Sequence, residues 1–234
     1  MIPAQDYLRI LPELIFSIFG IAIMLLEPVM PERGSRKPLG ILAFIGCAAA
    51  LAATFYQVNT QGEAFFGMVR VDAFSIFFHA VIAIVAGLVV LASLEYLDVQ
   101  QIHAGEYYAL ILFGSAGMAL MSLAVELVLI FIALEISSIS TYVLAGIRRR
   151  AAISAEASIK YFLLGSFATA FFLYGVALIF GATGSTSITT IAVAMASNHE
   201  PLVYVAVALM FVGIGFKVAA APFHIWTPDV YEGS

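Results

Sequence analysis

Charged residues are scarce in this chain: only 11% of its 234 residues are Asp, Glu, Lys or Arg, whereas 63% are hydrophobic. Soluble domains carry roughly a quarter charged residues, so this composition, with a mean hydropathy of +1.05, excludes a water-soluble globular domain. At roughly 20 apolar residues per span, a chain of this length holds about seven transmembrane helices and no folded domain outside the membrane. The formal net charge of −5 gives no support for a nucleic-acid partner.

Cysteine is almost absent. Cys47 lies in an apolar run, so the chain by itself supplies neither a disulfide framework nor a four-thiolate iron–sulfur cluster. We interpret Cys47 as a packing residue. A basic amino-terminal cluster is also lacking, because Asp6 precedes Arg9, so we expect the first helix to remain in the mature protein rather than act as a cleaved signal peptide.

Long apolar runs are abundant instead. Lys217 is the only Lys, Arg, Asp or Glu within the five clearest runs, which are residues 39–58, 73–94, 107–125, 161–183 and 202–223. Two further spans are predicted at residues 8–29 and 127–147, and the second of these contains Glu135. Unbroken runs of this length predict helices rather than the alternating strands of a β-barrel. Small residues, as in Gly114-Ser115-Ala116-Gly117, predict close helix packing.

The basic residues predict an orientation. Six of the ten lie in odd-numbered loops, in the clusters Arg33, Arg36, Lys37 and Arg148, Arg149, Arg150, whereas the even-numbered loops hold only Arg70. Basic residues in short loops stay on the cytoplasmic side, so we expect the amino terminus outside and the carboxyl end inside. The acidic loop after the third helix departs from this pattern, and we give the two basic clusters more weight.

Two ionisable residues lie at predicted bilayer depth, where a charge costs on the order of 3 kcal/mol. Ser138 and Tyr142 follow Glu135 at helical offsets, which places hydroxyl groups on the same helix face as the carboxylate. Pro222 comes shortly after Lys217 and lacks the N–H that would continue the helix. The sequence therefore predicts a broken helix beside Lys217, and such breaks occur where a helix faces protein or a water-filled cavity.

A buried Glu135 and Lys217 pair has two interpretations. It either locks two helices together as a salt bridge or transfers protons. Buried pairs often stabilise a protein no better than apolar residues, whereas burial brings the proton affinities of carboxyl and amino groups toward neutrality. We therefore favour proton transfer. The sequence offers no metal-ligand spacing, no nucleotide fingerprint and no nucleophile beside a base.

Other polar residues remain open to two interpretations. Lys160 begins the sixth predicted helix four residues after Glu156, so it forms either an interfacial salt bridge or part of a relay. His224 is either an ordinary loop histidine or a titrating group. We interpret His79 as a core histidine with satisfied hydrogen bonds, and we expect Glu126 to face solvent in a tight turn.

Four motifs mark the second half of the chain: LEISS at 134–138, SAEASIKYFLLG at 154–165, GFKV at 215–218 and PFHIWTPDVYEG at 222–233. With these motifs the chain resembles the antiporter-like membrane subunits of respiratory complex I. Among them it is most similar to subunit N of bacterial NADH:quinone oxidoreductase, called subunit 2 in mitochondria and chloroplasts. The resemblance extends over the whole chain.

This resemblance implies an all-α polytopic membrane fold with about seven transmembrane helices, which begins an antiporter-like inverted repeat and has a broken seventh helix. It implies an amino-terminal three-helix segment over 1–105 and an incomplete first repeat over 106–234. The chain ends before the eighth helix of the family. We therefore expect it to be a piece of a longer subunit or to be completed by another chain.

The resemblance also implies roles for individual residues. Glu135 and Lys217 match the pair in the entry half of the proton path of the family, Lys160 matches a relay lysine, and His224 matches a histidine beside the helix break. The implied function is proton translocation by a multi-pass subunit of NADH:quinone oxidoreductase in the bacterial inner (cytoplasmic) membrane.

The expected partners are the lipid bilayer and the other membrane-arm subunits of complex I. NADH, FMN, iron–sulfur clusters and quinone are expected in those partner subunits, so we expect no cofactor, no metal and no complete active site in this chain. The alternatives are a subunit of a sodium/proton antiporter or membrane-bound hydrogenase, or a purely structural segment of the membrane arm.

Overall fold

The fold is a bundle of long apolar helices. The computed structural model describes residues 3–30, 35–100, 102, 104–197 and 201–234. Within this part of the chain six helices are long and apolar enough to cross a membrane. They are α2 (Leu11–Leu26, extended to Val29 by a 3-10 turn), α3 (Lys37–Gln57), α4 (Ala73–Gln100), α5 (Ala104–Leu123), α6 (Leu127–Ala145) and α7 (Ala152–Thr183). The shorter apolar helix α9 (Pro201–Lys217) completes the seven predicted spans. The predicted fold class is therefore confirmed.

The helix bounds differ from the prediction at three places. A short helix, α1 (Ala4–Arg9), precedes α2, and α7 begins at Ala152, well before the apolar run that predicted it. In the seventh span the helix ends at Lys217 instead of continuing to residue 223, and a separate helix, α10 (Thr227–Gly233), follows the break. The break that Pro222 predicted is thus present.

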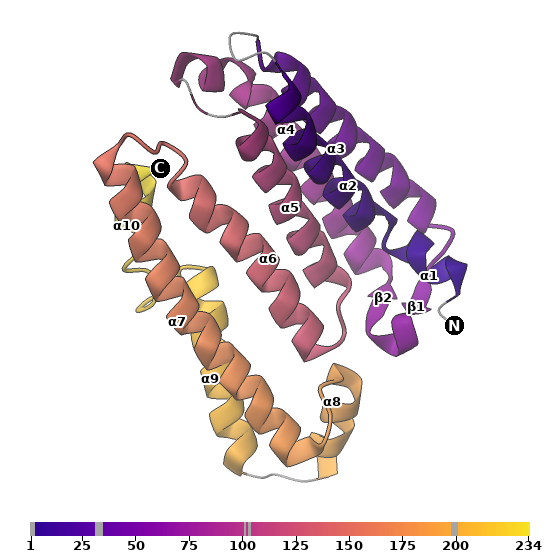
Figure 1. Cartoon of the computed structure of the whole chain (residues 1–234). Coiled ribbons are helices and arrows are strands. Elements are labelled where there is room, and N and C mark those ends of the chain that lie inside the picture. The colour runs from indigo at the N-terminus through magenta and orange to yellow at the C-terminus, as the bar shows by residue number, and fades with distance from the viewer. Residues whose placement is uncertain (1–2, 31–34, 101, 103, 198–200) are drawn as a thin grey trace.

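The long helices form two neighbouring groups (Figure 1). Helices α2, α3, α4 and α5 pack together around a core that contains Phe16, Leu39, Val90 and Leu112. Helix α7 packs along α9, and α10 also lies against α7. Helix α5 contacts α6, and α6 contacts α7, so α6 lies between the two groups.

Glycines allow the closest helix contacts. A Cβ atom at Gly175 of α7 would lie 2.6 Å from the carbonyl oxygen of Ala206 in α9, and one at Gly213 of α9 would lie 2.6 Å from Cβ of Phe172. A Cβ atom at Gly117 of α5 would lie 2.7 Å from the backbone nitrogen of Ser137 in α6. Close approach through small residues, as the sequence predicted, therefore holds the bundle together.

Two local elements were not predicted. Strands β1 (Gly62–Ala64) and β2 (Val69–Val71) form an antiparallel hairpin that pairs Glu63 with Arg70 and lies at one end of the bundle (Figure 1). A helix, α8 (Ile188–Ser197), occupies the connection between α7 and α9. Helix α7 runs to Thr183 and ends at Gly184, which has a positive φ of 70°.

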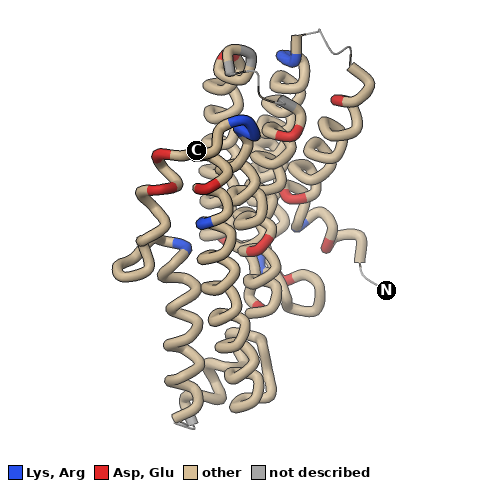
Figure 2. The backbone as a smooth tube through the Cα atoms, turned by 60° about the vertical axis from the view of Figure 1, so that its left-hand side comes forward, with Lys and Arg blue, Asp and Glu red and all other residues tan. Residues whose placement is uncertain are grey.

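Charged residues are unevenly distributed over the bundle. Figure 2 shows long stretches of backbone without any charge, chiefly where α7 runs toward α8 and α9. In the sequence, residues 161–197 and 201–216 carry no Lys, Arg, Asp or Glu. Lys217 is therefore the first charged residue at the end of an otherwise neutral helix.

Candidate proton-transfer site

Lys217 is the last residue of α9. Beyond it Ala219 adopts a positive φ of 51°, and the N–H of Ala220 donates to the carbonyl of Gly215 over 2.8 Å, which closes the helix end. Pro222 follows after a cis peptide bond and cannot donate a helical N–H. The carboxyl end of a helix carries a partial negative charge, so the break gives the ammonium group of Lys217 a favourable position.

Ser138 joins Lys217 to the helix that carries Glu135. The Lys217 Nζ donates a hydrogen bond to the Ser138 hydroxyl over 3.0 Å, and Ser138 itself is only 1% exposed. Ser138 lies one helical turn after Glu135, so both side chains belong to the same face of α6. Oε1 of Glu135 is buried without a hydrogen-bond partner, and no ion pair within 4 Å joins Glu135 to Lys217 in the described part of the chain, so Ser138 connects the two. The structure thus brings together the two residues that the sequence paired.

Aromatic rings enclose the break after Lys217. The rings of Tyr161 and Trp226 stack with their centroids 4.3 Å apart, and Tyr142 meets Tyr161 edge-on at 4.6 Å. Trp226 follows the break, whereas Tyr161 comes from α7 and Tyr142 from α6. Tyr142 and Ser138 lie four residues apart on α6, one helical turn from each other. The predicted polar face of Glu135, Ser138 and Tyr142 is therefore present, but the stacking of Trp226 on Tyr161 was not predicted.

Lys160 lies outside this group, in an exposed cluster of acids. Its Nζ is 2.7 Å from Oε1 of Glu156 and 2.6 Å from Oδ2 of Asp229 in α10, and the Lys160 side chain is 44% exposed. The salt bridge to Glu156 was one of the two interpretations of the sequence, whereas the contact with Asp229 was not foreseen. The relay role of Lys160 stays a prediction.

The remaining candidates have simpler positions. His224 is exposed in the turn between α9 and α10, as in the loop-histidine interpretation, and its role in proton transfer stays a prediction. Cys47 is buried in the core around α3, where it packs as expected.

Glu126 was expected to face solvent, which is wrong: it is half-buried and caps α6 by accepting the N–H of Leu129 over 2.8 Å. An unpaired N–H at the helix start attracts a carboxylate to this position.

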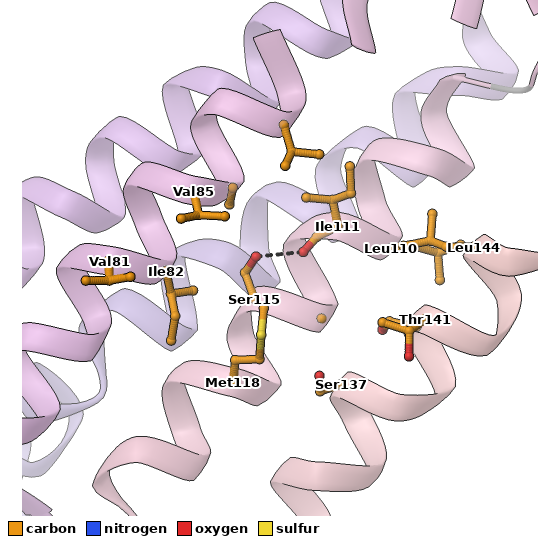
Figure 3. A pocket seen from close by; sticks show the side chains of 14 residues that line it. Val81, Ile82, Val85, Leu110, Ile111, Ser115, Met118, Ser137, Thr141 and Leu144 are labelled. Carbon is orange, nitrogen blue, oxygen red and sulfur yellow. Dashed lines mark hydrogen bonds between the residues drawn. The ribbon is translucent and has the colours of Figure 1, made fainter. Parts of the chain in front are cut away.

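An apolar pocket of about 330 Å³ lies on another face of α6 (Figure 3). Side chains from α4, α5 and α6 line it, among them Val81, Ile82, Val85, Ile111, Met118 and Leu144. The hydroxyl groups of Ser115, Ser140 and Thr141 at its wall donate to carbonyls of their own helices. The pocket is therefore suited to an apolar chain and adds nothing to the group around Lys217.

Metal ligation has no support in the described part of the chain, where no three His, Cys, Asp or Glu side chains gather into a group that could hold a metal ion.

Known proteins are similar to this chain in sequence and in fold. The sequence profile of the family described as "NADH:quinone oxidoreductase/Mrp antiporter, TM" matches residues 124–234. The chain is 60% identical, over its whole length, to NADH-quinone oxidoreductase subunit N 2 of Koribacter versatilis, and covers 49% of that protein. Just under half of the chain therefore matches this family directly, and its whole length is similar to an oxidoreductase subunit N.

Two solved structures share the fold. A chain of respiratory complex I from Thermus thermophilus, solved with bound aureothin, superposes with a TM-score of 0.77 at 38% identity, over 95% of this chain and 47% of that chain. A chain of an archaeal membrane-bound sulfane sulfur reductase superposes with a TM-score of 0.82 at 26% identity, over 99% of this chain and 48% of that one.

The chain spans about half the length of the curated family members that it matches. The segment that the family profile matches, residues 124–234, contains every residue singled out for proton transfer: Glu135, Lys160, Lys217 and His224.

Proposed function

We propose that this chain forms part of a proton-translocating membrane subunit of NADH:quinone oxidoreductase. The observation that carries the proposal is the hydrogen bond from Lys217 to Ser138, one turn from Glu135, at the broken end of a helix. The ammonium group of Lys217 thus lies against the polar face of α6 that carries the Glu135 carboxylate. Charged groups inside an apolar bundle are costly, and they mark ion and proton pathways. The relationship to subunit N supports the same assignment.

In this proposal, redox events elsewhere in the complex change the separation of Glu135 and Lys217. Two unit charges roughly 8 Å apart, at an effective dielectric constant near 20, interact by about 2 kcal/mol. A movement that adds or removes this interaction changes the proton affinity of either group by more than about tenfold. The pair therefore takes up or releases a proton when the helices move. Lys160 and His224 are the further proton-transfer residues.

The proposal includes the setting of the chain. Its partners are the lipid bilayer and other membrane-arm subunits of complex I, which hold the NADH, FMN, iron–sulfur and quinone sites, so this chain has no complete active site of its own. We place it in the inner membrane of a bacterium with the amino terminus outside, because the basic clusters of the odd-numbered loops favour that side as cytoplasmic. Residues 1–105 form the three-helix segment and 106–234 the incomplete repeat.

Replacing Lys217 by alanine in the assembled complex tests the proposal. Lys217→Ala should suppress proton pumping, measured in vesicles as acidification during NADH oxidation, while leaving assembly on native gels normal. The matched control is Lys37→Ala, since Lys37 is an exposed lysine at the start of α3, which packs with α2, α4 and α5 rather than along α9. Normal pumping by a fully assembled Lys217→Ala complex would refute a proton-transfer role.

A sodium/proton antiporter subunit is the second candidate, because the family description covers Mrp antiporters as well as the oxidoreductase. Transport that depends on sodium and continues without NADH oxidation would favour it. If the chain is instead a purely structural segment of the membrane arm, a complex with Glu135→Gln should keep full proton pumping coupled to NADH oxidation.

A further inference from the structure

The apolar pocket of about 330 Å³ lies over α5, between α4 and α6 (Figure 3). Helix α5 packs against both neighbours, and all three helices contribute side chains to the lining. Val81 and Val85 of α4 are 38% and 52% exposed, so the pocket opens onto the outer surface of the bundle. Its volume is at the lower end of the range of about 300 to 1,000 Å³ that ligand sites occupy.

The pocket lies at the depth of the hydrocarbon core. Val81 and Val89 are both about two helical turns inside the membrane span of α4, Ala73–Leu97. The hydroxyl groups of Ser115 and Thr141 donate to carbonyls of their own helices over 2.8 Å, so they offer no proton to a ligand. A surface at this depth meets acyl chains rather than water. The occupant of the pocket is therefore apolar.

A basic loop lies at one end of the pocket. Helices α4 and α6 end, and α5 begins, at the same end of the bundle, where the loop after α6 carries Arg148, Arg149 and Arg150. The Nη2 of Arg149 is 2.6 Å from Oε2 of Glu106 in α5. Leu110 lines the pocket and follows Glu106 at a helical offset, so both lie on one face of α5. The ion pair therefore places the basic loop over this end of the pocket.

The other two arginines of the loop keep their charge for a further anion. Arg148 donates to the backbone carbonyls of Gly233 and Ser234, which carry no net charge. Arg150 is exposed, and no carboxylate of the described residues lies within 4 Å of its guanidinium group. Glu95 is an exposed acid on α4 at the same end, so an anion is favoured beside the loop after α6 and disfavoured beside α4.

We propose that the pocket binds an acyl chain of an anionic phospholipid whose phosphate group contacts the loop at residues 148–150. The chain lies along α5 between α4 and α6, and the headgroup lies where α6 ends. The apolar lining accepts the chain. The arginines select the headgroup, because guanidinium groups bind phosphate through paired hydrogen bonds and basic residues at a membrane surface attract anionic lipids.

Photolabelling of the assembled complex in lipid vesicles tests this site. The probe is phosphatidylglycerol with a diazirine group in one acyl chain, and mass spectrometry identifies the labelled peptides. We expect labels on residues 81–89 of α4 and 110–118 of α5. Unlabelled phosphatidylglycerol should compete with the probe more strongly than phosphatidylcholine, by about fivefold for each arginine that contacts the headgroup.

A pair of matched double variants tests the pocket itself. Val81→Phe/Val85→Phe places two rings in the lining and should reduce labelling of residues 110–118 several-fold. Ile84→Phe/Leu88→Phe places the same rings, at the same spacing, on exposed positions of α4 outside the lining. This control should be labelled like the wild type.

A single charge variant tests the headgroup without changing the pocket. Arg150→Gln should weaken competition by phosphatidylglycerol about fivefold. Lys37→Gln should not, because Lys37 is a basic residue at the same end but begins α3, which contributes no side chain to the lining.

Three results would each overturn the proposal. They are wild-type labelling of Val81→Phe/Val85→Phe, equal competition by the two lipids, and absence of label from residues 81–89 and 110–118 of the wild type, which would mean that protein covers the pocket. None of these measurements needs NADH or proton pumping, so their outcome is independent of the proposed function.

Discussion

Lys217 and Ser138 lie 79 positions apart in the sequence, and a 3.0 Å hydrogen bond connects their side chains. Lys217 reaches this contact because α9 ends at that residue, and the broken end meets the serine one turn beyond Glu135 on α6. The bond therefore joins the cation of one helix to the carboxylate-bearing face of another. Removing this hydrogen bond would change how Lys217 lies relative to Glu135 while keeping both charged groups.

Ser138→Ala should weaken coupled proton transport without unfolding the chain. Hydrogen bonds to charged groups contribute about 1.5 to 3 kcal/mol, so we expect pumping to slow by about tenfold. The measurement is the initial rate of vesicle acidification per NADH oxidised. Ser140→Ala is the matched control, because Ser140 is equally buried in α6 but donates to the carbonyl of Ile136 in its own helix. Equal effects of the two variants would contradict a specific role for Ser138.

Trp226→Ala should destabilise the segment that follows the helix break. Trp226 is 8% exposed and stacks on Tyr161, and truncation of a buried aromatic side chain costs about 3 to 5 kcal/mol. We expect lower assembly and heat tolerance on native gels, and slower pumping in the complexes that do assemble. Trp226→Phe keeps an apolar ring at this position and should recover most of both. Wild-type heat tolerance of the alanine variant would show that the stack is unimportant.

Variants at Lys160 distinguish its two interpretations. The side chains of Lys160 and Asp229 are 44% and 47% exposed, and exposed pairs contribute at most about 1 kcal/mol. We expect the double variant Glu156→Gln/Asp229→Asn to change heat tolerance only slightly and to keep pumping. Lys160→Ala should lower pumping if Lys160 relays protons. If all these variants pump normally, Lys160 serves only as a salt bridge.

Gly175→Ala and Gly181→Ala test the close packing of α7 on α9. The new Cβ at Gly175 would meet backbone atoms of α9, and overpacking costs about 1 to 3 kcal/mol. Gly181 belongs to the same helix, and a Cβ atom added there would meet no atom within 4 Å, so alanine should be neutral or stabilise by up to about 1 kcal/mol. The measurement is the temperature at which half of the complex dissociates. Equal shifts at both positions would contradict the packing argument.

Local patterns predicted most of the bundle. An apolar run of bilayer length specifies a membrane helix almost regardless of its neighbours, because the backbone must satisfy its own hydrogen bonds in lipid. The predicted spans at 39–58 and 127–147 accordingly agree with α3 and α6. The hairpin of β1 and β2 escaped prediction because its strands have only three residues each, and their pairing depends on contacts with distant residues such as Arg9.

The sequence alone determined that this chain is a membrane protein, roughly where its seven apolar spans lie, and which ionisable residues fall within those spans. Hydrophobicity and the geometry of proline act over short stretches of the chain, so the local sequence is enough to predict their effects. Only the tertiary structure decided that Lys217 reaches Ser138, that Asp229 joins Lys160, and that Arg149 meets Glu106. Those contacts depend on how helices cross and where they end, and side chains many residues apart become neighbours only once the whole bundle has packed.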